Sequence, residues 1–333
     1  MSKKRLIPFI ILMLLLAACA PAPTPAASQA PTPAPTPVKV RLPVGYVPNV
    51  QFAPLYIAID KGYFRQAGLD VTIDYNMETD IVSLVGANQL QFGMVSGEQV
   101  LLGRAQGMPI VYVMSWYQNY PIGVTLKASE HVTRPAELKG KRIGIPALSG
   151  ASYIGLRALL AAGGLTEKDI TLDTIGYTQV EALAAGREDG VVTYFTNEPV
   201  QLKAQGVDVN TLRVADYTHL VSNGLLTNET TLKQHPELVR GMVKALLRGI
   251  ADTVADPQQA FQISTKYVEG LSTSANAGVQ RQVLDATLEL WKTNRPGYTD
   301  PAAWENMQKV MLDMGLLTQP LDLTKVYSNA YLP

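Results

Sequence analysis

The side chains best suited to binding chemistry lie in five short stretches, at residues 46–52, 96–99, 116–120, 149–153 and 194–198. These stretches combine aromatic rings with amides, hydroxyls and carboxyls, and they contain no Lys or Arg. Aromatic side chains can sandwich a flat ring, and amides can hydrogen-bond to its edges, whereas an anion is usually bound by Arg, Lys or a helix amino terminus. The pattern therefore favours a flat aromatic ligand. The candidate ligand-binding residues are Tyr46, Asn49, Gln51, Phe52, Ser96, Glu98, Trp116, Tyr117, Asn119, Ser149, Ser152, Tyr153, Tyr194 and Asn197.

Residues 149–152 can be interpreted in two ways. Ser149 precedes an expected helix, so its hydroxyl suits an N-cap, and the first amides of that helix also suit contact with a ligand. The sequence alone leaves both open.

Segments expected to be strands must position these stretches. Short β-rich runs at residues 40–45, 71–75, 92–95, 110–115, 142–145, 171–175 and 190–194 alternate with helical patterns at 52–61, 149–162 and 179–185. Such alternation is typical of an α/β fold. In open α/β sheets, ligands bind beyond the carboxyl ends of the strands, which is where the five stretches lie.

The carboxyl-terminal part of the sequence is helical in pattern. Helices are expected at residues 236–254, 257–267, 278–294 and 301–314, and several have proline at a first-turn position. Extended segments at 122–127 and 220–227 flank a compact block. We therefore expect a first lobe of residues 38–127 plus 220–333, a second lobe of 128–219, and two hinge crossovers with a ligand cleft between the lobes.

The amino terminus has the pattern of a lipoprotein signal peptide over residues 1–18. Basic residues at positions 3–5 precede an apolar run at 6–18, which ends in small residues before Cys19. The run is shorter than the roughly 20 residues that a spanning helix needs. Since Cys19 is the sole cysteine, no internal disulfide can form. We expect lipidation of Cys19 and a location on the extracytoplasmic side of a cell membrane.

The segment after Cys19 is expected to be a tether. Residues 20–37 consist of Ala, Pro, Thr, Ser and Gln, with seven prolines. Such a chain cannot bury a core and runs as an extended, polyproline-like linker. Residues 19–37 would then join the lipid to the globular part.

The charge balance argues against a nucleic-acid partner. The sequence has 28 basic and 28 acidic residues, so loss of the three basic residues at positions 3–5 leaves a formal charge of about −3. No basic stripe with interleaved aromatic residues is present.

Several motifs resemble the thiamine-precursor family of periplasmic solute-binding proteins. They are PLYIAIDKGYF at residues 54–64, AGLDV at 67–71, VSGEQ at 95–99, QGMPI at 106–110 and ELKGKRIG at 137–144. The likeness extends from about residue 40 to 315, and the opening motif also occurs in sulfonate and nitrate binders.

The resemblance implies a two-lobe periplasmic-binding-protein fold of type II and a role in import by an ABC transporter, with a membrane permease and its ATPase as partners. Within the family, the chain is most similar to riboflavin-binding lipoproteins. This implies riboflavin, or a related flat aromatic vitamin, as a transported ligand and no cofactor. A pyrimidine precursor of thiamine is the alternative ligand.

An enzyme is the alternative from another class, because the family also resembles a fungal pyrimidine synthase that uses iron, a histidine and a cysteine-rich motif. That motif cannot exist with Cys19 alone. The histidines His131, His219 and His235 are scattered, and neither a metal-ligand spacing nor a nucleophile elbow occurs. A purely structural surface lipoprotein is a third possibility, which the two-lobe pattern disfavours.

Overall fold

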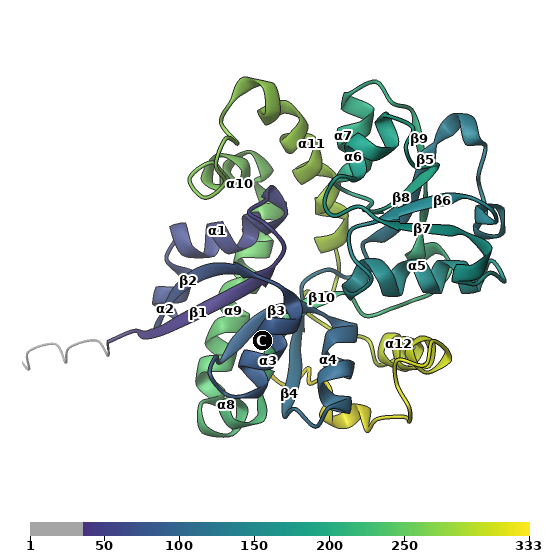
Figure 1. The fold of residues 1–333 in the computed structure, drawn as a ribbon. Helices are drawn as coiled ribbons and strands as arrows, with labels where there is room; N and C mark the ends of the chain where they lie inside the picture. The colour runs from purple at the N-terminus through teal and green to yellow at the C-terminus, as the bar shows by residue number, and fades with distance from the viewer. Residues whose placement is uncertain (1–35) are drawn as a thin grey trace, which may run out of the picture. The chain divides into compact units, whose positions relative to one another are not determined.

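The computed structural model describes residues 36–333, which form two five-stranded sheets with helices around them (Figure 1). The first sheet has the order β2-β1-β3-β10-β4, and the second has the order β7-β6-β8-β5-β9. The strands are β1 (Val38–Gly45), β2 (Leu69–Asn76), β3 (Phe92–Ser96), β4 (Ile110–Ser115), β5 (Ile122–Lys127), β6 (Arg142–Ile145), β7 (Thr171–Thr174), β8 (Gly190–Tyr194), β9 (Val209–Arg213) and β10 (Asn223–Asn228).

The strand directions bring the carboxyl ends of the parallel strands together at one edge of each sheet. In the first sheet β1 runs parallel to β2 and β3, and β10 lies antiparallel between β3 and β4. In the second sheet β6 is parallel to β7 and β8, and β5 is antiparallel to β8 and β9. The carboxyl ends of β1 to β4 therefore share one edge, as do those of β6 to β8.

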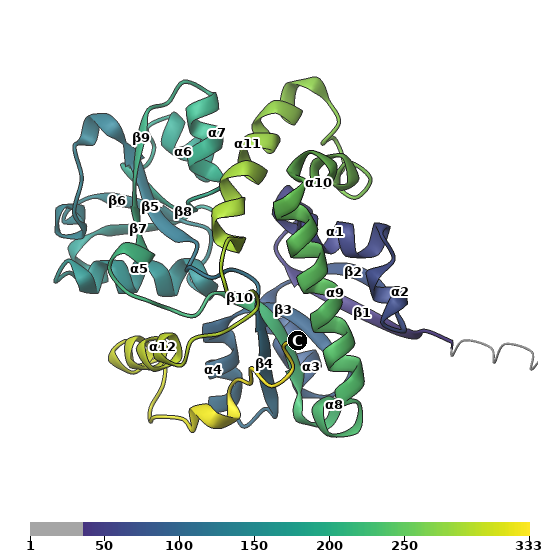
Figure 2. The ribbon, with the colours of Figure 1, turned by 180° about the vertical axis from the view of Figure 1, so that it is seen from behind.

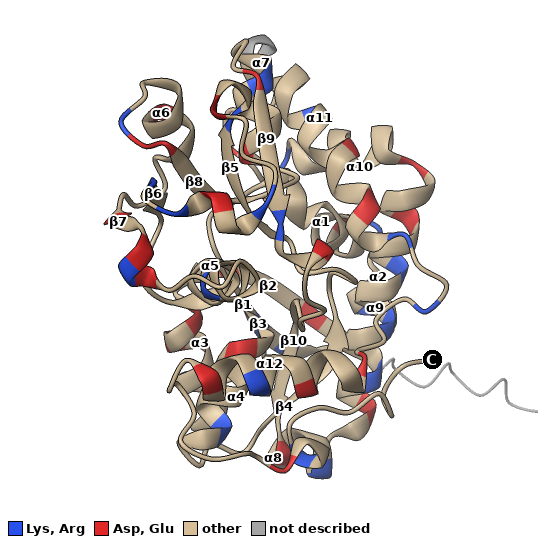
Figure 3. Ribbon diagram, turned by 90° about the vertical axis from the view of Figure 1, so that its right-hand side faces the viewer, with Lys and Arg blue, Asp and Glu red and all other residues tan. Residues whose placement is uncertain are grey.

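The first sheet is covered mainly by helices from the two ends of the chain (Figures 1 and 2). These are α1 (Ala53–Asp60), α2 (Tyr63–Gln66), α3 (Glu78–Gly86), α4 (Gly97–Ala105), α8 (Glu229–Gln234), α9 (Pro236–Ala255), α10 (Pro257–Ser264) and α12 (Pro301–Asp313). The second sheet is covered by α5 (Gly150–Ala162), α6 (Gln179–Ala184) and α7 (Glu198–Ala204). Both signs of charge occur side by side on outer helices such as α12 (Figure 3).

Helix α11 (Ser274–Trp291) bridges the two sheet units, since it packs against α9 and α10 on one side and α7 on the other (Figure 2). Arg213 of β9 forms a 3.0 Å ion pair with Glu289 of this helix. The backbone N–H of Gln118, in the segment between β4 and β5, donates to the carbonyl of Leu290 at 2.9 Å. The helix thus contacts the first crossover as well as both sheet units.

The carboxyl-terminal segment covers the β4 edge of the first sheet. The backbone N–H of Tyr112 donates to the carbonyl of Val326, and the N–H of Ser328 donates back to Tyr112, both at 2.9 Å. Tyr327 stacks on Trp304 with ring centroids 5.3 Å apart. An open strand edge is a template for unwanted pairing, and this segment occupies it.

The α/β class and the helical carboxyl-terminal part agree with the sequence. The seven expected strands are present with ends shifted by at most about two residues, whereas β9, α2, α3, α4 and α7 were not anticipated. Residues 122–127, expected at the end of the first lobe, form β5 and pair with β8 and β9 in the second sheet. Strand pairing therefore places the first crossover at residues 116–121, before the expected boundary.

The expected signal peptide, the lipidation of Cys19 and most of the tether lie outside the described residues. Within residues 36–333, no helix combines the length and apolar character that crossing a bilayer requires.

Helices α1 and α9 approach each other most closely at a glycine. A Cβ atom placed on Gly249 of α9 would lie 2.1 Å from the carbonyl oxygen of Pro54 in α1, which is backbone and cannot yield easily. The tight contact lets α9 lie flat against α1, over a core that includes Leu55, Ala58 and Leu246.

We expect Gly249→Ala to lower the free energy of unfolding by about 1–3 kcal/mol, because overpacking outweighs the better helix propensity of alanine. The matched control is Gly278→Ala in α11, where a Cβ meets nothing within 4 Å. That variant should gain about 0.5–1 kcal/mol. Urea unfolding of both variants checks this, and equal stabilisation by the two would contradict the tight α1–α9 contact.

Candidate ligand-binding cavity

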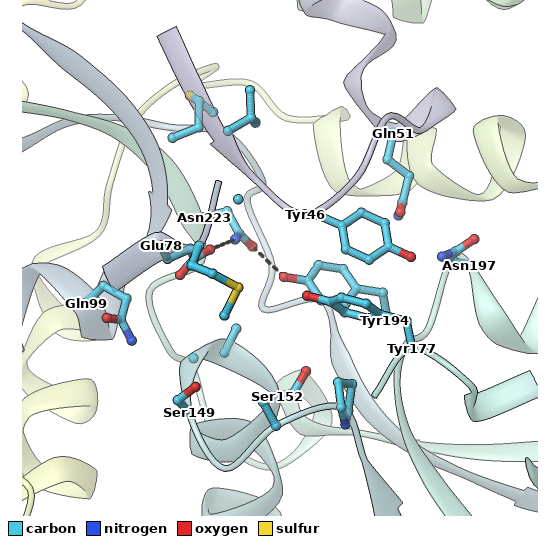
Figure 4. Close-up of a pocket in the computed structure, with 18 of the residues that line it drawn as sticks. Tyr46, Gln51, Glu78, Gln99, Ser149, Ser152, Tyr177, Tyr194, Asn197 and Asn223 are labelled. Atoms are coloured by element: carbon cyan, nitrogen blue, oxygen red, sulfur yellow. Dashed lines mark hydrogen bonds between the residues drawn. The ribbon is translucent and has the colours of Figure 1, made fainter. Parts of the chain in front are cut away.

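A cavity of about 150 Å³ opens where the carboxyl ends of strands from the two sheets face each other (Figure 4). A cavity of this size holds at least one benzene-sized ring. Residues following β1, β2 and β3 line one side, and residues following β6, β7 and β8 line the other. The crossover residues Trp116 and Asn223 complete the wall.

Tyrosine rings form one part of the wall. Tyr46, directly after β1, and Tyr177, after β7, meet edge to face with ring centroids 5.1 Å apart. Tyr194 at the end of β8 lies beside them (Figure 4). Tyr177 is 58% exposed, so its ring is available to a partner that enters the cavity. Edge-to-face and stacked contacts with further rings suit such side chains.

Tyr46 is held in an unusual backbone conformation. Its φ is +104°, a region in which a bulky side chain is strained at a cost of about 1–3 kcal/mol. Strain of this kind persists where surrounding contacts fix the residue, and it clusters at ligand clamps. The conformation places the ring of Tyr46 in the wall between Gln51 and Tyr177 (Figure 4).

The inner end of the cavity is built from larger aromatic rings. Trp116 is 2% exposed and meets Trp291 of α11 at a centroid distance of 5.9 Å and an interplanar angle of 87°. Tyr117 packs against both tryptophans. The indole N–H of Trp116 is buried without a hydrogen-bond partner among the described residues. Burial raises the pKa of Tyr117, which keeps its hydroxyl neutral.

Amides from both sides of the cavity offer hydrogen bonds. Gln51 donates through Nε2 to the Thr196 hydroxyl at 3.0 Å, which joins the first unit to the second. Asn197 donates to Glu198 at 3.2 Å. Asn223 accepts from the Tyr194 hydroxyl at 3.4 Å and donates to Glu78 at 3.5 Å (Figure 4). The two contacts of Asn223 are longer than ordinary hydrogen bonds, so they are weak and can be exchanged for contacts with a ligand.

Two glutamates share one serine beside the cavity. Ser96 Oγ contacts Glu78 Oε2 and Glu98 Oε1, and the Ser96 N–H donates to Glu78 Oε2 at 3.2 Å. A hydroxyl has one proton, so it can donate to only one of the two carboxyls, and the other must carry a proton to donate to Oγ. Glu98 is fully buried and its Oε2 has no partner among the described residues, so the proton belongs on Glu98.

The pKa shifts agree with this assignment. Burial, and secondarily the charge of Glu78, raise the pKa of Glu98 to about 8. Burial also raises the pKa of Glu78, although hydrogen bonds from Ser96 oppose the shift. Glu198 begins α7 and accepts from the Tyr194 N–H at 2.9 Å, and burial raises its pKa to about 7.

The cavity wall carries no basic group. Among the described residues that line it, none is Lys, Arg or His, and the acidic ones are Glu78 and Glu198. An anion entering the cavity would therefore lose hydration without meeting a cation.

The structure brings many of the sequence-derived candidates together. The ones that line the cavity are Tyr46, Gln51, Phe52, Trp116, Tyr117, Ser149, Ser152, Tyr194 and Asn197. Ser149 and Ser152 lie at the amino terminus of α5, and the Ser149 side chain makes no cap hydrogen bond. Ser149 thus stands at the N-cap position of α5 with extended backbone, although its hydroxyl does not cap the helix.

Five candidates do not line the cavity. Asn49 caps residues 50–52 by accepting from the Gln51 N–H at 2.9 Å. Ser96 and Glu98 lie behind the wall and hold Glu78. Asn119 is exposed in the first crossover, and the Tyr153 hydroxyl turns away to Glu167 and Arg157.

Other lining residues were missed by the sequence reasoning. They are mainly Asn76 at the end of β2, Met77, Glu78 and Thr79 after it, Tyr177 and Gln179 after β7, and Asn223, whereas Gln99 and Glu198 lie in predicted stretches but were not among the candidates. The runs that became β2 and β7 were recognised, and the rule that ligands bind beyond strand ends points to their following residues as well. Asn223 stands at the amino end of an antiparallel strand, where that rule gives no signal.

We expect the buried carboxyls to make stability depend on pH. The folded protein holds a proton on Glu98 up to pH 8, whereas an unfolded glutamate loses it near pH 4.3, so the free energy of unfolding should fall as pH rises between these values. Glu98→Gln mimics the protonated form and should flatten this slope in urea unfolding from pH 5 to 8. Glu305→Gln, on the exposed face of α12, should leave the slope as it is. An unchanged slope in Glu98→Gln would contradict the proton assignment.

Comparison with known proteins places the chain in a family. A family model described as NMT1/THI5 like matches residues 49–260. The riboflavin-binding protein RibY of Chloroflexus aurantiacus is 39% identical over 302 residues, which cover 88% of this chain and 86% of that protein. A formylaminopyrimidine-binding protein of Halalkalibacterium halodurans is 27% identical, with 87% of this chain and 89% of that protein covered.

More distant similarity reaches an enzyme and a solved binding-protein structure. A 4-amino-5-hydroxymethyl-2-methylpyrimidine phosphate synthase of Legionella pneumophila is 22% identical over 88% of this chain and 92% of that enzyme. The periplasmic aliphatic sulphonate binding protein SsuA of Escherichia coli has a TM-score of 0.69 at 14% identity, covering 87% of this chain and 91% of that structure. The chain therefore belongs to the NMT1/THI5-like family and has the fold of periplasmic binding proteins.

Proposed function

We propose that the chain is an extracytoplasmic solute-binding protein of an ABC importer, and that it holds riboflavin in the cavity between its two sheets. The observation that carries this proposal is the cavity wall, which offers tyrosine rings, amides and two carboxyls, and no Lys, Arg or His among its described residues. The 39% identity to a riboflavin-binding protein supports the choice of ligand.

A flavin matches the chemistry of this wall. Its fused rings are flat and uncharged, which suits stacking on Tyr46, Tyr177 or Tyr194. Its ring edge and polyol tail carry hydrogen-bonding groups that suit Gln51, Asn197 and neighbouring hydroxyls. A ligand of about 27 heavy atoms at about 0.3 kcal/mol per atom reaches about −8 kcal/mol, which is micromolar affinity without unusual contacts.

A pyrimidine precursor of thiamine is the second candidate. It is supported by the 27% identity to a formylaminopyrimidine-binding protein and by a cavity whose volume of about 150 Å³ already suits a single ring. A ligand of about ten heavy atoms needs more binding energy per atom, usually from charged hydrogen bonds. Glu78 is the group in the wall best placed to supply one.

We do not assign an enzymatic activity, although the chain is 22% identical to a synthase. The sole cysteine of the sequence, Cys19, lies far from the cavity residues along the chain, so no cysteine-rich motif accompanies the cavity. The histidines His131, His219 and His235 are outside its lining. Binding without chemistry is therefore the proposed role.

The proposed mechanism is closure of one lobe on the other around the ligand. The lobes would be built on the two sheets, with hinges at the crossovers β4 to β5 and β9 to β10. Solute held first by one lobe would stabilise the closed form, which would dock on a membrane permease whose ATPase drives import. The Gln51–Thr196 hydrogen bond and the Tyr46–Tyr177 contact span the two sides and support this proposal.

The proposed attachment is a lipid on Cys19 after removal of residues 1–18, followed by the tether of residues 19–37. The support is the short apolar run that ends in Leu16, Ala17, Ala18 and Cys19. Stable anchoring needs more than one acyl chain, and bacterial lipoproteins carry more than one.

We expect purified protein to quench the fluorescence of riboflavin on titration, with Tyr177→Ala binding about tenfold more weakly, because a stacked ring adds about 0.5–1.5 kcal/mol beyond its burial. Tyr217→Ala is the matched control, since Tyr217 is also exposed, at 42%, and does not line the cavity. If the protein bound a thiamine pyrimidine precursor and did not bind riboflavin, the pyrimidine would replace riboflavin as the proposed ligand.

We expect Cys19→Ser to move the protein from the membrane fraction to the soluble fraction of expressing cells. The physical reason is the loss of the acyl chains, since the proposed tether contains no apolar segment that would insert in their place. Incorporation of labelled palmitate checks the modification directly. Retention of the variant in the membrane fraction with an intact signal region would indicate an uncleaved anchor.

A further inference from the structure

The electrostatics of the cavity point to a restriction on the charge of its ligand. Glu78 accepts from the Ser96 N–H and from Asn223, and Glu198 accepts from the Tyr194 N–H and from Asn197. Both carboxyls are thus held in place by neutral donors, and no Lys, Arg or His shares the wall with them among the described residues. Negative charge at this site has no cationic partner.

The helices that begin at the cavity do not change this balance. The amino terminus of a helix attracts an anion with the strength of about half a charge. α3, α4, α6 and α7 all begin at the cavity, and each carries a glutamate of its own in the first turn. These glutamates are Glu78, Glu98, Glu181 and Glu198. The positive ends of α3, α6 and α7 are therefore already matched by acidic side chains of the protein, whereas the protonated Glu98 adds no charge at the end of α4.

Two helix ends at the cavity lack an acidic residue. α1 follows a turn of 3-10 helix that Asn49 caps, and α5 begins at Gly150 with no acidic residue in its first turn. The α5 terminus suits a neutral acceptor such as a ring carbonyl. The half positive charge at this terminus is small compared with the charge of a phosphate monoester, which is about −1.5 to −2 at neutral pH. It is also small compared with the charges of the two carboxyls in the wall.

We propose that the cavity accepts the uncharged form of its aromatic ligand and rejects the phosphorylated form, with Glu78 and Glu198 as the residues that discriminate. The inference rests on the proposed binding function and deepens it. For a flavin it means that riboflavin binds and riboflavin 5′-phosphate does not compete with it. For a pyrimidine it means that the free alcohol binds and its phosphate ester does not.

The test is a competition at pH 8 between three flavins on the full-length protein: riboflavin, its 5′-phosphate and its neutral 5′-acetyl ester. The phosphate should bind at least about 100-fold more weakly than riboflavin, because a multiply charged group is brought near carboxylates in a site of low polarity. The acetyl ester adds bulk at the same position without charge and should bind within about fivefold of riboflavin. Equal binding of riboflavin and its phosphate would overturn the proposal, and equal weakening by both esters would show that size, not charge, discriminates.

Variants identify the discriminating residues. Replacing Glu78 and Glu198 together by glutamine keeps the side-chain shapes and removes both charges, so the ratio of riboflavin to phosphate affinities should fall at least about tenfold. The matched control is Glu181→Gln, because Glu181 occupies the first turn of α6 but is exposed and does not line the cavity. An unchanged ratio in a folded double variant would show that these glutamates do not discriminate.

Failure of the proposed function is distinguishable from failure of this inference. If no flavin binds, riboflavin is not the ligand, and 4-amino-5-hydroxymethyl-2-methylpyrimidine with its phosphate then tests the same charge rule. Preference for the free pyrimidine would support the rule with the other ligand. Preference for the phosphate, or binding of neither compound, would overturn it.

Discussion

The antiparallel placement of β10 between β3 and β4 is the constraint on which the rest of the structure depends. The chain must leave the first sheet after β4, build the second sheet, and return to fill a central position in the first. Two crossovers follow from this route, and both lie at the edge where the parallel strands of each sheet end. Side chains that follow different strands, such as Tyr46 and Tyr177, can therefore meet although they are far apart in sequence.

The same edge determines the electrostatics of the cavity. Helices that follow parallel strands begin there, so their positive ends converge on one volume. In this chain Glu78, Glu98 and Glu198 occupy those ends, and the single proton of Ser96 forces Glu98 to remain neutral beside Glu78. A protein named as a sulphonate binder shares this fold at 14% identity.

The sequence predicted the strands well because buried strands are short apolar runs, a local property that needs no knowledge of pairing. It predicted much of the cavity for the same reason, since the residues after a strand are local to it. Pairing is not local, so the membership of residues 122–127 in the second sheet could not be predicted. Side-chain direction is equally hidden. Tyr153 lies in the right stretch and yet turns to Glu167, whereas Asn223 contributes from the amino end of a strand.

The late position of β10 also has a consequence for how the chain acquires its structure. β1 to β4 are complete by Ser115, but the strand that joins β3 to β4 begins at Asn223, and the segment that covers the β4 edge includes Tyr327. Pairings between such distant segments form slowly, because closing a long loop costs conformational entropy before the stabilising contacts form. A growing chain thus carries an unfinished sheet for most of its synthesis.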